Sequence, residues 1–311
     1  MSARTRPRSL PRLLGRAVLG VGAVGAGTLG YAIWEARSFR LRRVDVPVLP
    51  AGTDPIRVLH ISDLHLTPDQ RAKQRWLSRL AELEPDLVID TGDNLAHVDA
   101  VPYVTRSLGR LLDRPGVFVW GSNDYYGPSF KNPLRYLTQP ERKGAASTNV
   151  LPWGDLRDAF VNRGWHDLTH REVRLEVAGV RITFRGTDDA HLNQDDYPQV
   201  AGPVDPAADL TIGVTHAPYL RVLDPMAADG HDLIVAGHTH GGQVCVPLYG
   251  ALVTNCDLDT ARVKGLSSHR AGGHESLLHV SAGLGTSPYA PIRFACPPEA
   301  TLMTLVPRPA A

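Results

Sequence analysis

Cysteine, lysine and net charge are all scarce in this 311-residue sequence. The three cysteines form no Cys-x-x-Cys pair, which argues against a disulfide framework and against a structural zinc site. The 33 basic and 32 acidic residues leave a net charge of +1, which excludes a nucleic-acid-binding tail or an acidic disordered chain. With 43% hydrophobic residues, the chain can still build a full-sized core.

The near-neutral total conceals a basic N-terminus. The first 43 residues contain nine arginines and one glutamate, so they carry +8 and the rest of the chain carries −7. Between the two arginine groups, residues 17–34 form an uncharged run of 18 residues, within the range of about 17–25 expected for a membrane-spanning helix. We interpret this run as a membrane anchor. A cleaved signal peptide and a peripheral or buried helix are the alternatives.

The predicted anchor sets the expected location and domain organisation. Five arginines precede the uncharged run and four follow it, so the positive-inside bias favours an extracytoplasmic C-terminal part by one charge. We therefore expect a single-pass protein of the cell membrane. Residues 1–44 form the basic segment, anchor and juxtamembrane linker, and residues 45–311 form one catalytic domain.

Short apolar runs alternate with helical stretches along the rest of the chain. Residues 70–83 and 101–112 place apolar side chains at helical spacing, whereas residues 124–173 are irregular and predict an insertion with a long loop. This alternation predicts an α/β fold, in which ligands gather beyond the carboxyl ends of the strands. The strand-length runs are residues 56–59, 87–89, 117–120, 180–184, 210–214 and 233–236.

Polar motifs follow most of these predicted strands. Each motif alone is ordinary, since a Gly-Asp pair is usually a turn and a lone histidine is usually not a ligand. In combination they place six metal-binding side chains at neighbouring strand ends. Carboxylates mixed with imidazoles suit Mn, Fe or Zn better than Mg or Ca, so we predict a centre of two divalent metal ions. The six candidate ligands are Asp63, His65, Asp93, His216, His238 and His240.

In these motifs the sequence resembles the calcineurin-like metallophosphoesterase superfamily. The superfamily pattern is D-x-H, G-D, G-N-H-[DE], a single His and G-H-x-H, and the resemblance covers about residues 55–306. It implies a four-layered α/β/β/α sandwich of two mixed β-sheets flanked by helices. It also implies a first metal held by Asp63, His65, Asp93 and His240. Asp93 would bridge to a second metal held by the G-N-H-[DE] asparagine, His216 and His238.

Three further stretches are similar to a bacterial membrane-associated branch of this superfamily. They are GHTHGGQ at residues 237–243, AGLGTS at 282–287 and PIRF at 291–294. The branch is linked to UDP-2,3-diacylglucosamine hydrolases, which cleave a pyrophosphate in a nucleotide-linked glycolipid. The resemblance thus implies lipid metabolism and a phosphoester or pyrophosphate substrate. The backbone at Gly241 is expected to approach this substrate, because glycine permits close contact.

One motif departs from the superfamily pattern, because G-N-H-[DE] is replaced here by GSND at residues 121–124. Without a gap, Ser122 takes the place of the asparagine ligand and Asn123 that of the catalytic histidine. With a shift of one residue, Asn123 becomes the ligand instead. Asn123 can donate a hydrogen bond to substrate but cannot supply a proton. Either His97 or His191 then provides the acid, or the leaving group departs unaided; we assign catalysis to Asp93 and Asn123.

Two surface features keep alternative interpretations. Phe130, Tyr136, Leu137 and Trp153 form either an apolar lip for an acyl chain or a satellite hydrophobic cluster. The acidic residues around His191, at positions 188, 189, 195 and 196, are interpreted as a solvated loop rather than a substrate contact.

Three functions fit the sequence. The first is a membrane-associated hydrolase of a lipid-linked or nucleotide-linked phosphoester or pyrophosphate. The second is a phosphatase or cyclic-nucleotide phosphodiesterase acting on soluble substrates, and the third is a non-catalytic membrane-tethered metal-binding sensor. A nuclease is disfavoured because the catalytic part lacks a basic stripe for a nucleic-acid backbone. No protein partner is indicated.

Overall fold

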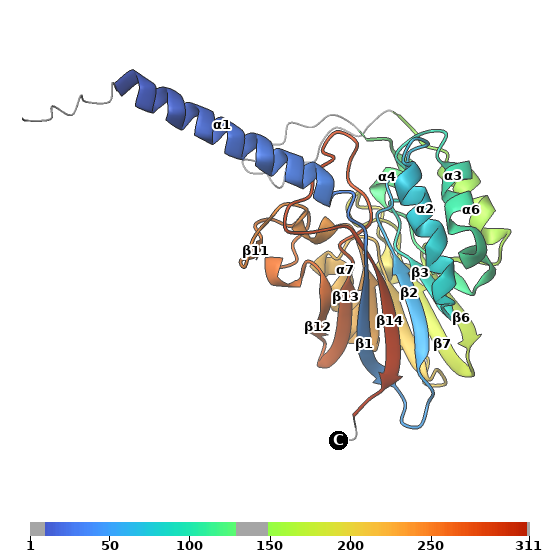
Figure 1. Ribbon diagram of the computed structural model, residues 1–311. Helices are drawn as coiled ribbons and strands as arrows, with labels where there is room; N and C mark the ends of the chain where they lie inside the picture. The colour runs from blue at the N-terminus through green and yellow to red at the C-terminus, as the bar shows by residue number, and fades with distance from the viewer. Residues whose placement is uncertain (1–9, 129–148, 310–311) are drawn as a thin grey trace, which may run out of the picture.

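The computed structural model describes the backbone of residues 10–128 and 149–309, and the side chains from residue 22 onward. Its centre consists of two six-stranded β-sheets (Figure 1). All neighbouring pairs in the first sheet are parallel except β14 with β2. The strand order is β1 (Arg40–Leu49), β14 (Glu299–Pro307), β2 (Ile56–Ile61), β3 (Leu87–Asp90), β4 (Gly116–Phe118) and β5 (His166–Asp167).

The second sheet is also mixed, with parallel pairs inside and an antiparallel pair at each edge. The predicted mixed α/β class with two mixed sheets is therefore confirmed, and each of the six predicted runs overlaps a strand. The strand order is β12 (Gly265–Ala271), β13 (His274–Val280), β9 (Leu233–Ala236), β8 (Leu210–Val214), β7 (Val180–Gly186) and β6 (Arg171–Val177).

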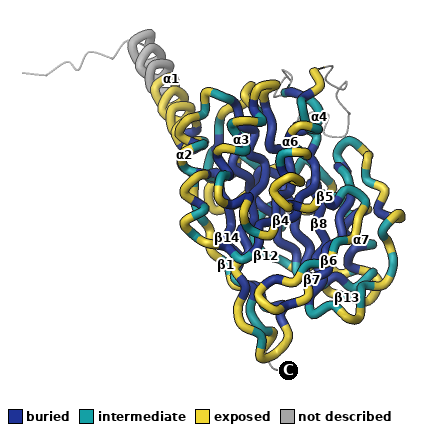
Figure 2. The backbone as a smooth tube through the Cα atoms, turned by 90° about the vertical axis from the view of Figure 1, so that its right-hand side faces the viewer, coloured by how far each residue is buried: buried dark blue, intermediate teal, exposed yellow. Residues whose placement is uncertain are grey.

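Alternating side chains of the strands build the separate cores. In β2, Val58 joins the cluster that both sheets share, whereas Leu59 joins the cluster formed with the helices. This alternation follows from the two-residue period of a strand, and it buries both faces of the inner strands of the first sheet, as the dark blue tube at the centre of Figure 2 shows. The helices of that cluster are α2 (Arg71–Arg79), η1 (Leu80–Leu83), α3 (Val101–Leu108), η2 (Gly109–Asp113) and α6 (Trp153–Val161).

A third cluster packs α7 (Leu220–Asp229) against the second sheet. Val222 and Met226 of α7 join Ile234 of β9 within this cluster. Helices therefore cover one face of each sheet, while the other two faces pack on one another. The remaining short elements are α4 (Ser122–Tyr125), η3 (Tyr197–Gln199), η4 (His240–Gly242), β10 (Cys245–Val246), β11 (Gly250–Ala251) and η5 (Thr260–Arg262).

The N-terminal helix α1 (Leu10–Glu35) projects away from the sheets in Figure 1. Its last turn is anchored, because Glu35 accepts a hydrogen bond from the amide of Cys296 and the carbonyl of Ala32 accepts one from Arg293. Among the described residues, no helix combines the length and apolar character needed to cross a bilayer, so the predicted membrane-spanning helix is unsupported. Strand β1 begins at Arg40, on the N-terminal side of the predicted boundary between residues 44 and 45.

The irregular stretch at residues 124–173 contains α4, α6 and β5 as well as loops. Three of the four predicted lip residues, Phe130, Tyr136 and Leu137, lie outside the described residues. The fourth, Trp153, packs edge-to-face on Trp120 and Tyr125, with ring centroids 5.8 and 5.2 Å apart. Trp153, the first residue of α6, is therefore half-buried against the core cluster of the helices.

Candidate metal centre

The candidate ligands follow the carboxyl ends of strands from both sheets. Asp63 and His65 follow β2, and Asp93 follows β3, all in the first sheet. His216 follows β8, while His238 and His240 follow β9, so the second sheet supplies the other ligands. Parallel neighbouring strands end at the same edge, which brings these separate parts of the sequence together.

The backbone is in the left-handed region at many of these positions. The φ angles are 51° at Asp63, 40° at His65, 58° at Asp93, 69° at His238 and 50° at His240. Residues with a Cβ rarely adopt this conformation, and each such residue costs about 1–3 kcal/mol. The surrounding fold therefore imposes the conformation that turns these side chains toward one another.

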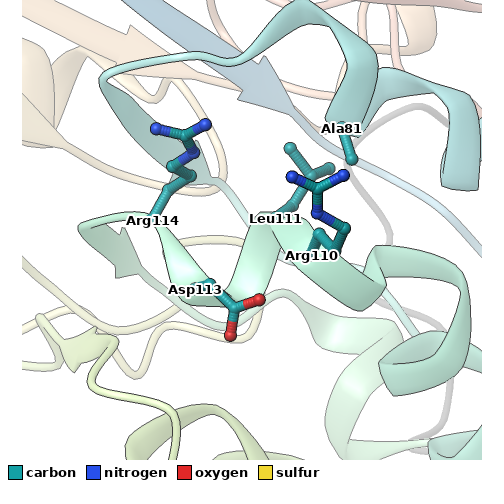
Figure 3. Close-up of a pocket in the computed structure, with 5 residues that line it drawn as sticks. All are labelled: Ala81, Arg110, Leu111, Asp113 and Arg114. Carbon is teal, nitrogen blue, oxygen red and sulfur yellow. The ribbon is translucent and has the colours of Figure 1, made fainter.

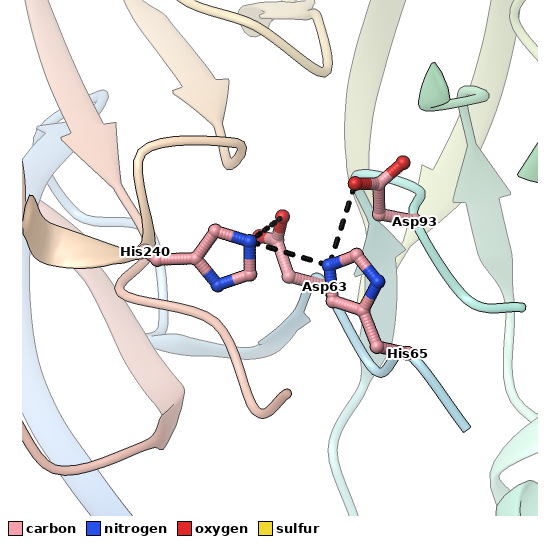
Figure 4. Close-up of side chains that lie close together, drawn as sticks. All are labelled: Asp63, His65, Asp93 and His240. Atoms are coloured by element: carbon pink, nitrogen blue, oxygen red, sulfur yellow. Dashed lines mark hydrogen bonds and ion pairs between the residues drawn. The ribbon is translucent and has the colours of Figure 1, made fainter. Parts of the chain in front are cut away.

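Four of the buried side chains converge on one point (Figure 4). One ligand atom from each of Asp63, His65, Asp93 and His240 lies within 4.8 Å of the others. The Nε2 atoms of His65 and His240 are 3.2 Å apart, and His240 Nε2 is 3.6 Å from Asp63 Oδ1. Asp63 Oδ1 is buried without a hydrogen-bond partner among the described residues. Because an unpaired buried acceptor is costly, this donor set fits a bound cation.

Electrostatics in this group also fit a cation. Burial raises the pKa of Asp63 to about 6, and the neighbouring Asp93 carboxylate contributes in the same direction. Burial lowers the pKa of His65 to about 4, so that imidazole is neutral at pH 7 with a lone pair available. Burial opposes ionisation of Asp93 as well, yet His216 and His65 outweigh it and hold the pKa of Asp93 below its usual range.

A second group adjoins Asp93 on the other side. His216 Nε2 is 3.6 Å from Asp93 Oδ2 and 3.3 Å from His238 Nδ1. His216 Nδ1 lies 2.6 Å from the carbonyl of Thr91, to which it donates, and this contact directs Nε2 toward Asp93. The Asp93 carboxylate thus lies between two sets of imidazoles, as a bridging ligand would.

The GSND loop at residues 121–124 is fixed by its last residue. Both carboxylate oxygens of buried Asp124 accept backbone amides, from Asp93 and Gly121 at one oxygen and from Asn94 and Leu95 at the other. Without a gap, this carboxylate takes the acidic position of the pattern G-N-H-[DE]. Asp124 therefore fixes the loop that carries Asp93 and the GSND loop relative to one another.

Asn123 makes direct hydrogen bonds to the Asp93 carboxylate. Asn123 donates its backbone amide to Asp93 Oδ1 and its side-chain amide to Asp93 Oδ2, both at 2.7 Å. Ser122 Oγ is 3.3 Å from the Asn123 amide nitrogen, at the edge of the group. Asn123 thus lies beside Asp93, and Ser122 lies beside Asn123.

A comparison with protein families identifies the chain. The model for calcineurin-like phosphoesterases matches residues 56–242, which include every candidate ligand. The chain belongs to the calcineurin-like phosphoesterase family. It is a metal-dependent phosphoesterase, as the names of several relatives also indicate.

The relatives extend over most of the chain. The uncharacterized metallophosphoesterase YkuE of Bacillus subtilis is 25% identical over 307 residues, covering 93% of this chain and 95% of YkuE. A bovine transmembrane protein with a metallophosphoesterase domain is 27% identical over 219 residues, covering 65% of this chain and 44% of the bovine protein. A solved 5'-nucleotidase precursor from Thermus thermophilus is 14% identical with a TM-score of 0.42, covering 81% of this chain and 55% of that one.

The other predicted site residues, Gly241, His191 and His97, differ in how close they lie to the candidate ligands. The Gly241 amide is already engaged by Thr239 Oγ1 at 3.2 Å, and Gly241 is buried. The ring of His191 lies 4.6 Å from that of His238, whereas His97 is half exposed and its Nδ1 faces Asp99. Of the two histidines predicted as substitutes for the missing acid, His191 is the one beside the candidate ligands.

Two residues next to the ligands were missed by sequence reasoning. Asp189 was assigned to a solvated loop, but it is fully buried and accepts the amides of His191 and Leu192. Burial raises the pKa of Asp189 to about 7.

Arg293 is also fully buried, and its guanidinium donates to the carbonyls of Ala282, Gly285 and His240. The PIRF motif gave a signal for Arg293, since an arginine inside an apolar motif often has a specific partner.

A separate depression lies among the helices on the outside of the first sheet (Figure 3). None of its lining residues is a candidate ligand, and two of its charged side chains have salt-bridge partners, Asp113 with Arg163 and Arg114 with Glu84. It therefore belongs to the helical layer rather than to the phosphoesterase centre. Its lining consists of Ala81, Arg110, Leu111, Asp113 and Arg114.

Proposed function

We propose that this phosphoesterase uses two divalent metal ions, Mn, Fe or Zn, to hydrolyse a phosphoester or pyrophosphate bond in a lipid-linked or nucleotide-linked substrate. The observation that carries the proposal is the convergence of four buried ligand atoms within 4.8 Å of one another. Two bound cations would activate water, orient the phosphoryl oxygens and stabilise the charge of the transition state.

The chain's own residues have distinct roles in this proposal. Asp63, His65 and His240 would hold the first ion, His216 and His238 would hold the second, and Asp93 would be a ligand of both. Asn123 then has two possible uses of its amide. Its oxygen completes the second metal site together with Ser122 Oγ, or its nitrogen donates to a phosphoryl oxygen.

The proton for the leaving group is assigned to His191. This histidine lies beside His238 and contacts the hydroxyl of Tyr219, with 3.1 Å between Nδ1 and the oxygen. Proton transfer from a positioned side chain contributes about 10²–10⁴-fold to the rate of such reactions. A nucleoside phosphate is a good enough leaving group to need less of this assistance.

The proposed substrate class rests on the resemblance to UDP-2,3-diacylglucosamine hydrolases, at GHTHGGQ, AGLGTS and PIRF. A lipid-linked substrate also implies action at the cell membrane, which the basic N-terminus supports by charge. We propose residues 45–311 as the catalytic domain, with β1 extending its first sheet to Arg40.

The test uses the full chain, because truncation at residue 45 would cut β1. Metal-stripped protein is reconstituted with Mn, Zn or Fe, and turnover of bis-p-nitrophenyl phosphate is compared between wild type, Asp93→Asn and the matched control Asp99→Asn. Asp99 is on the same loop but three-quarters exposed, so its variant is expected to behave as wild type. Metal-dependent turnover that is lost only in Asp93→Asn supports the proposal.

Substrate class is tested in the same preparation. A lipid-linked pyrophosphate in detergent micelles is compared with a soluble nucleotide diester, and preferential turnover of the micellar substrate is expected. Equal turnover of both would favour the soluble-substrate phosphatase. Full metal occupancy without turnover of any diester would favour the non-catalytic sensor, in which Ser122 and Asn123 have replaced the catalytic pair.

A further inference from the structure

Exposed apolar side chains are concentrated on one side of the molecule. Of fifteen large hydrophobic residues that are exposed in the described part of the chain, twelve lie in α1, in residues 244–253 or at Tyr289. Scattered exposed hydrophobics are normal in soluble proteins, but a contiguous group indicates a contact surface. We call this group the apolar face; it contains Val24, Leu29, Tyr31, Ile33, Trp34, Val244, Val246, Leu248, Tyr249, Leu252, Val253 and Tyr289.

Direct contacts connect the end of α1 to the start of the hairpin. The ring of Tyr31 in α1 lies 5.3 Å from that of Phe294, edge to face. Phe294 in turn makes backbone hydrogen bonds with Gln243 and Cys245, at the start of the β10–β11 hairpin. The hairpin and the end of α1 therefore both contact the loop that carries Phe294.

The tip of the hairpin is costly in two ways. Leu248 is completely exposed, at 110% of its reference accessibility, and its φ angle is 69°. Exposure of an apolar side chain to water is unfavourable. A branched residue is also disfavoured in the left-handed region, where glycine or asparagine is the usual choice. Tyr249 beside it is 75% exposed. Such a tip is unfavourable in water alone, but it becomes favourable if Leu248 enters an apolar phase.

Charge identifies what kind of apolar phase this is. No Asp, Glu, Lys or Arg occurs from Gln243 to Cys256, so the hairpin can be desolvated without burying a charge. At the junction of α1 and β1, Arg37 and Arg40 are exposed, while the acidic Glu35 is buried. An uncharged tip next to exposed arginines and aromatic rings matches the interfacial zone of an anionic bilayer.

We propose that the β10–β11 hairpin and the end of α1 form a docking surface for an anionic lipid bilayer, with Leu248 and Tyr249 inserted among the acyl chains. Docking of this kind needs no membrane-spanning helix. The hairpin follows His240 of η4 by only a few residues, so the bound bilayer lies close to the metal centre. A lipid-linked substrate then reaches the metals without leaving the interface; in this respect the inference rests on the proposed function.

The experiment measures vesicle binding by the full chain without substrate, so it is independent of turnover. Wild type, Leu248→Asn and the control Val161→Asn are sedimented with vesicles of phosphatidylcholine alone or mixed with phosphatidylglycerol. Asparagine tolerates the left-handed backbone, so Leu248→Asn removes the apolar side chain without strain. Val161 is an exposed valine of α6, which lies on the other side of the molecule in Figure 1.

We expect wild type and Val161→Asn to bind phosphatidylglycerol vesicles, and Leu248→Asn to bind about tenfold more weakly. Arg37→Gln combined with Arg40→Gln should weaken binding to the anionic vesicles while leaving binding to phosphatidylcholine unchanged. Turnover of bis-p-nitrophenyl phosphate, measured on each protein, should be unchanged in all of these variants. This turnover tests the proposed function separately from docking.

Three results would overturn the inference. They are the absence of vesicle binding by wild type, equal binding by Leu248→Asn, and a concentration-dependent dimer that Leu248→Asn abolishes. The last result would show that a second copy of the chain, rather than a bilayer, covers the apolar face.

Discussion

Replacement of Asp124 by alanine is expected to destabilise the metal centre, because it removes the acceptor of four backbone amides in the loops that carry Asp93 and Asn123. Asp124 is fully buried and accepts four backbone amides, those of Asp93 and Asn94 at 2.7 Å, Gly121 at 3.1 Å and Leu95 at 3.2 Å. These amides belong to the two loops that carry Asp93 and Asn123. The side chain therefore acts as a clamp between the ends of β3 and β4.

The magnitude follows from the number of amides that lose their acceptor. A buried donor left unpaired costs about 1–3 kcal/mol, so four amides in Asp124→Ala give a loss of at least about 4 kcal/mol. Asp124→Asn keeps one side-chain oxygen and the shape of the residue. It leaves two amides facing a donor instead of an acceptor, and we expect a loss of about half that size.

The assay is urea unfolding of the metal-free protein, followed by measurement of metal affinity by calorimetry. Exposed Asp99→Ala on the same loop is the control and should change stability by less than about 0.5 kcal/mol. A loss of less than about 1 kcal/mol in Asp124→Ala would refute the reasoning, because it would show that water satisfies the four amides. Unchanged metal affinity in a destabilised variant would refute the clamp on Asp93.

The remaining predictions concern metal binding. Burial raises the pKa of Asp63 to about 6, and the pKa of His216 reaches about 9 because three carboxylates outweigh its burial. Both groups must lose a proton to bind a cation, so metal affinity should rise with pH across this range and binding should release protons. Calorimetry in buffers of different ionisation enthalpy counts those protons, and a flat affinity would contradict the assignment. Arg293→Met should leave several carbonyls near His240 unpaired and weaken the first metal site more than the second, whereas Arg293→Lys should restore part of the affinity.

Much of the fold could be predicted from local pattern. Apolar runs such as residues 56–59 and 210–214 have strand length and composition, so their positions needed no tertiary information. The pairing of β1 with β14 could not be predicted, because it joins residues at opposite ends of the chain. The uncharged run at residues 17–34 was correctly expected to be helical, but its predicted role as a membrane-spanning anchor is unsupported.

The candidate ligands could be chosen from the sequence, because carboxylates and imidazoles placed directly after neighbouring parallel strands lie at the same edge of a sheet. The convergence of these side chains on one point could be seen only in the tertiary structure. Left-handed backbone at Asp63, Asp93 and His240 turns the side chains inward, and only the surrounding packing imposes such a conformation.

The supporting residues show the same division. Asp189 and Arg293 have ordinary sequence neighbours, yet folding removes both from water. Asp189 accepts amides of its own loop, whereas Arg293 donates to the carbonyl of His240, which is 53 residues away. Burial and partner choice depend on residues distant in sequence, so a local pattern cannot encode them. The sequence by itself determined the strands, the order of the motifs and the chemistry of the ligands. The tertiary structure decided their convergence, their protonation, the Asp124 clamp and the exposure of Leu248, because each of these depends on what lies next to a residue in space.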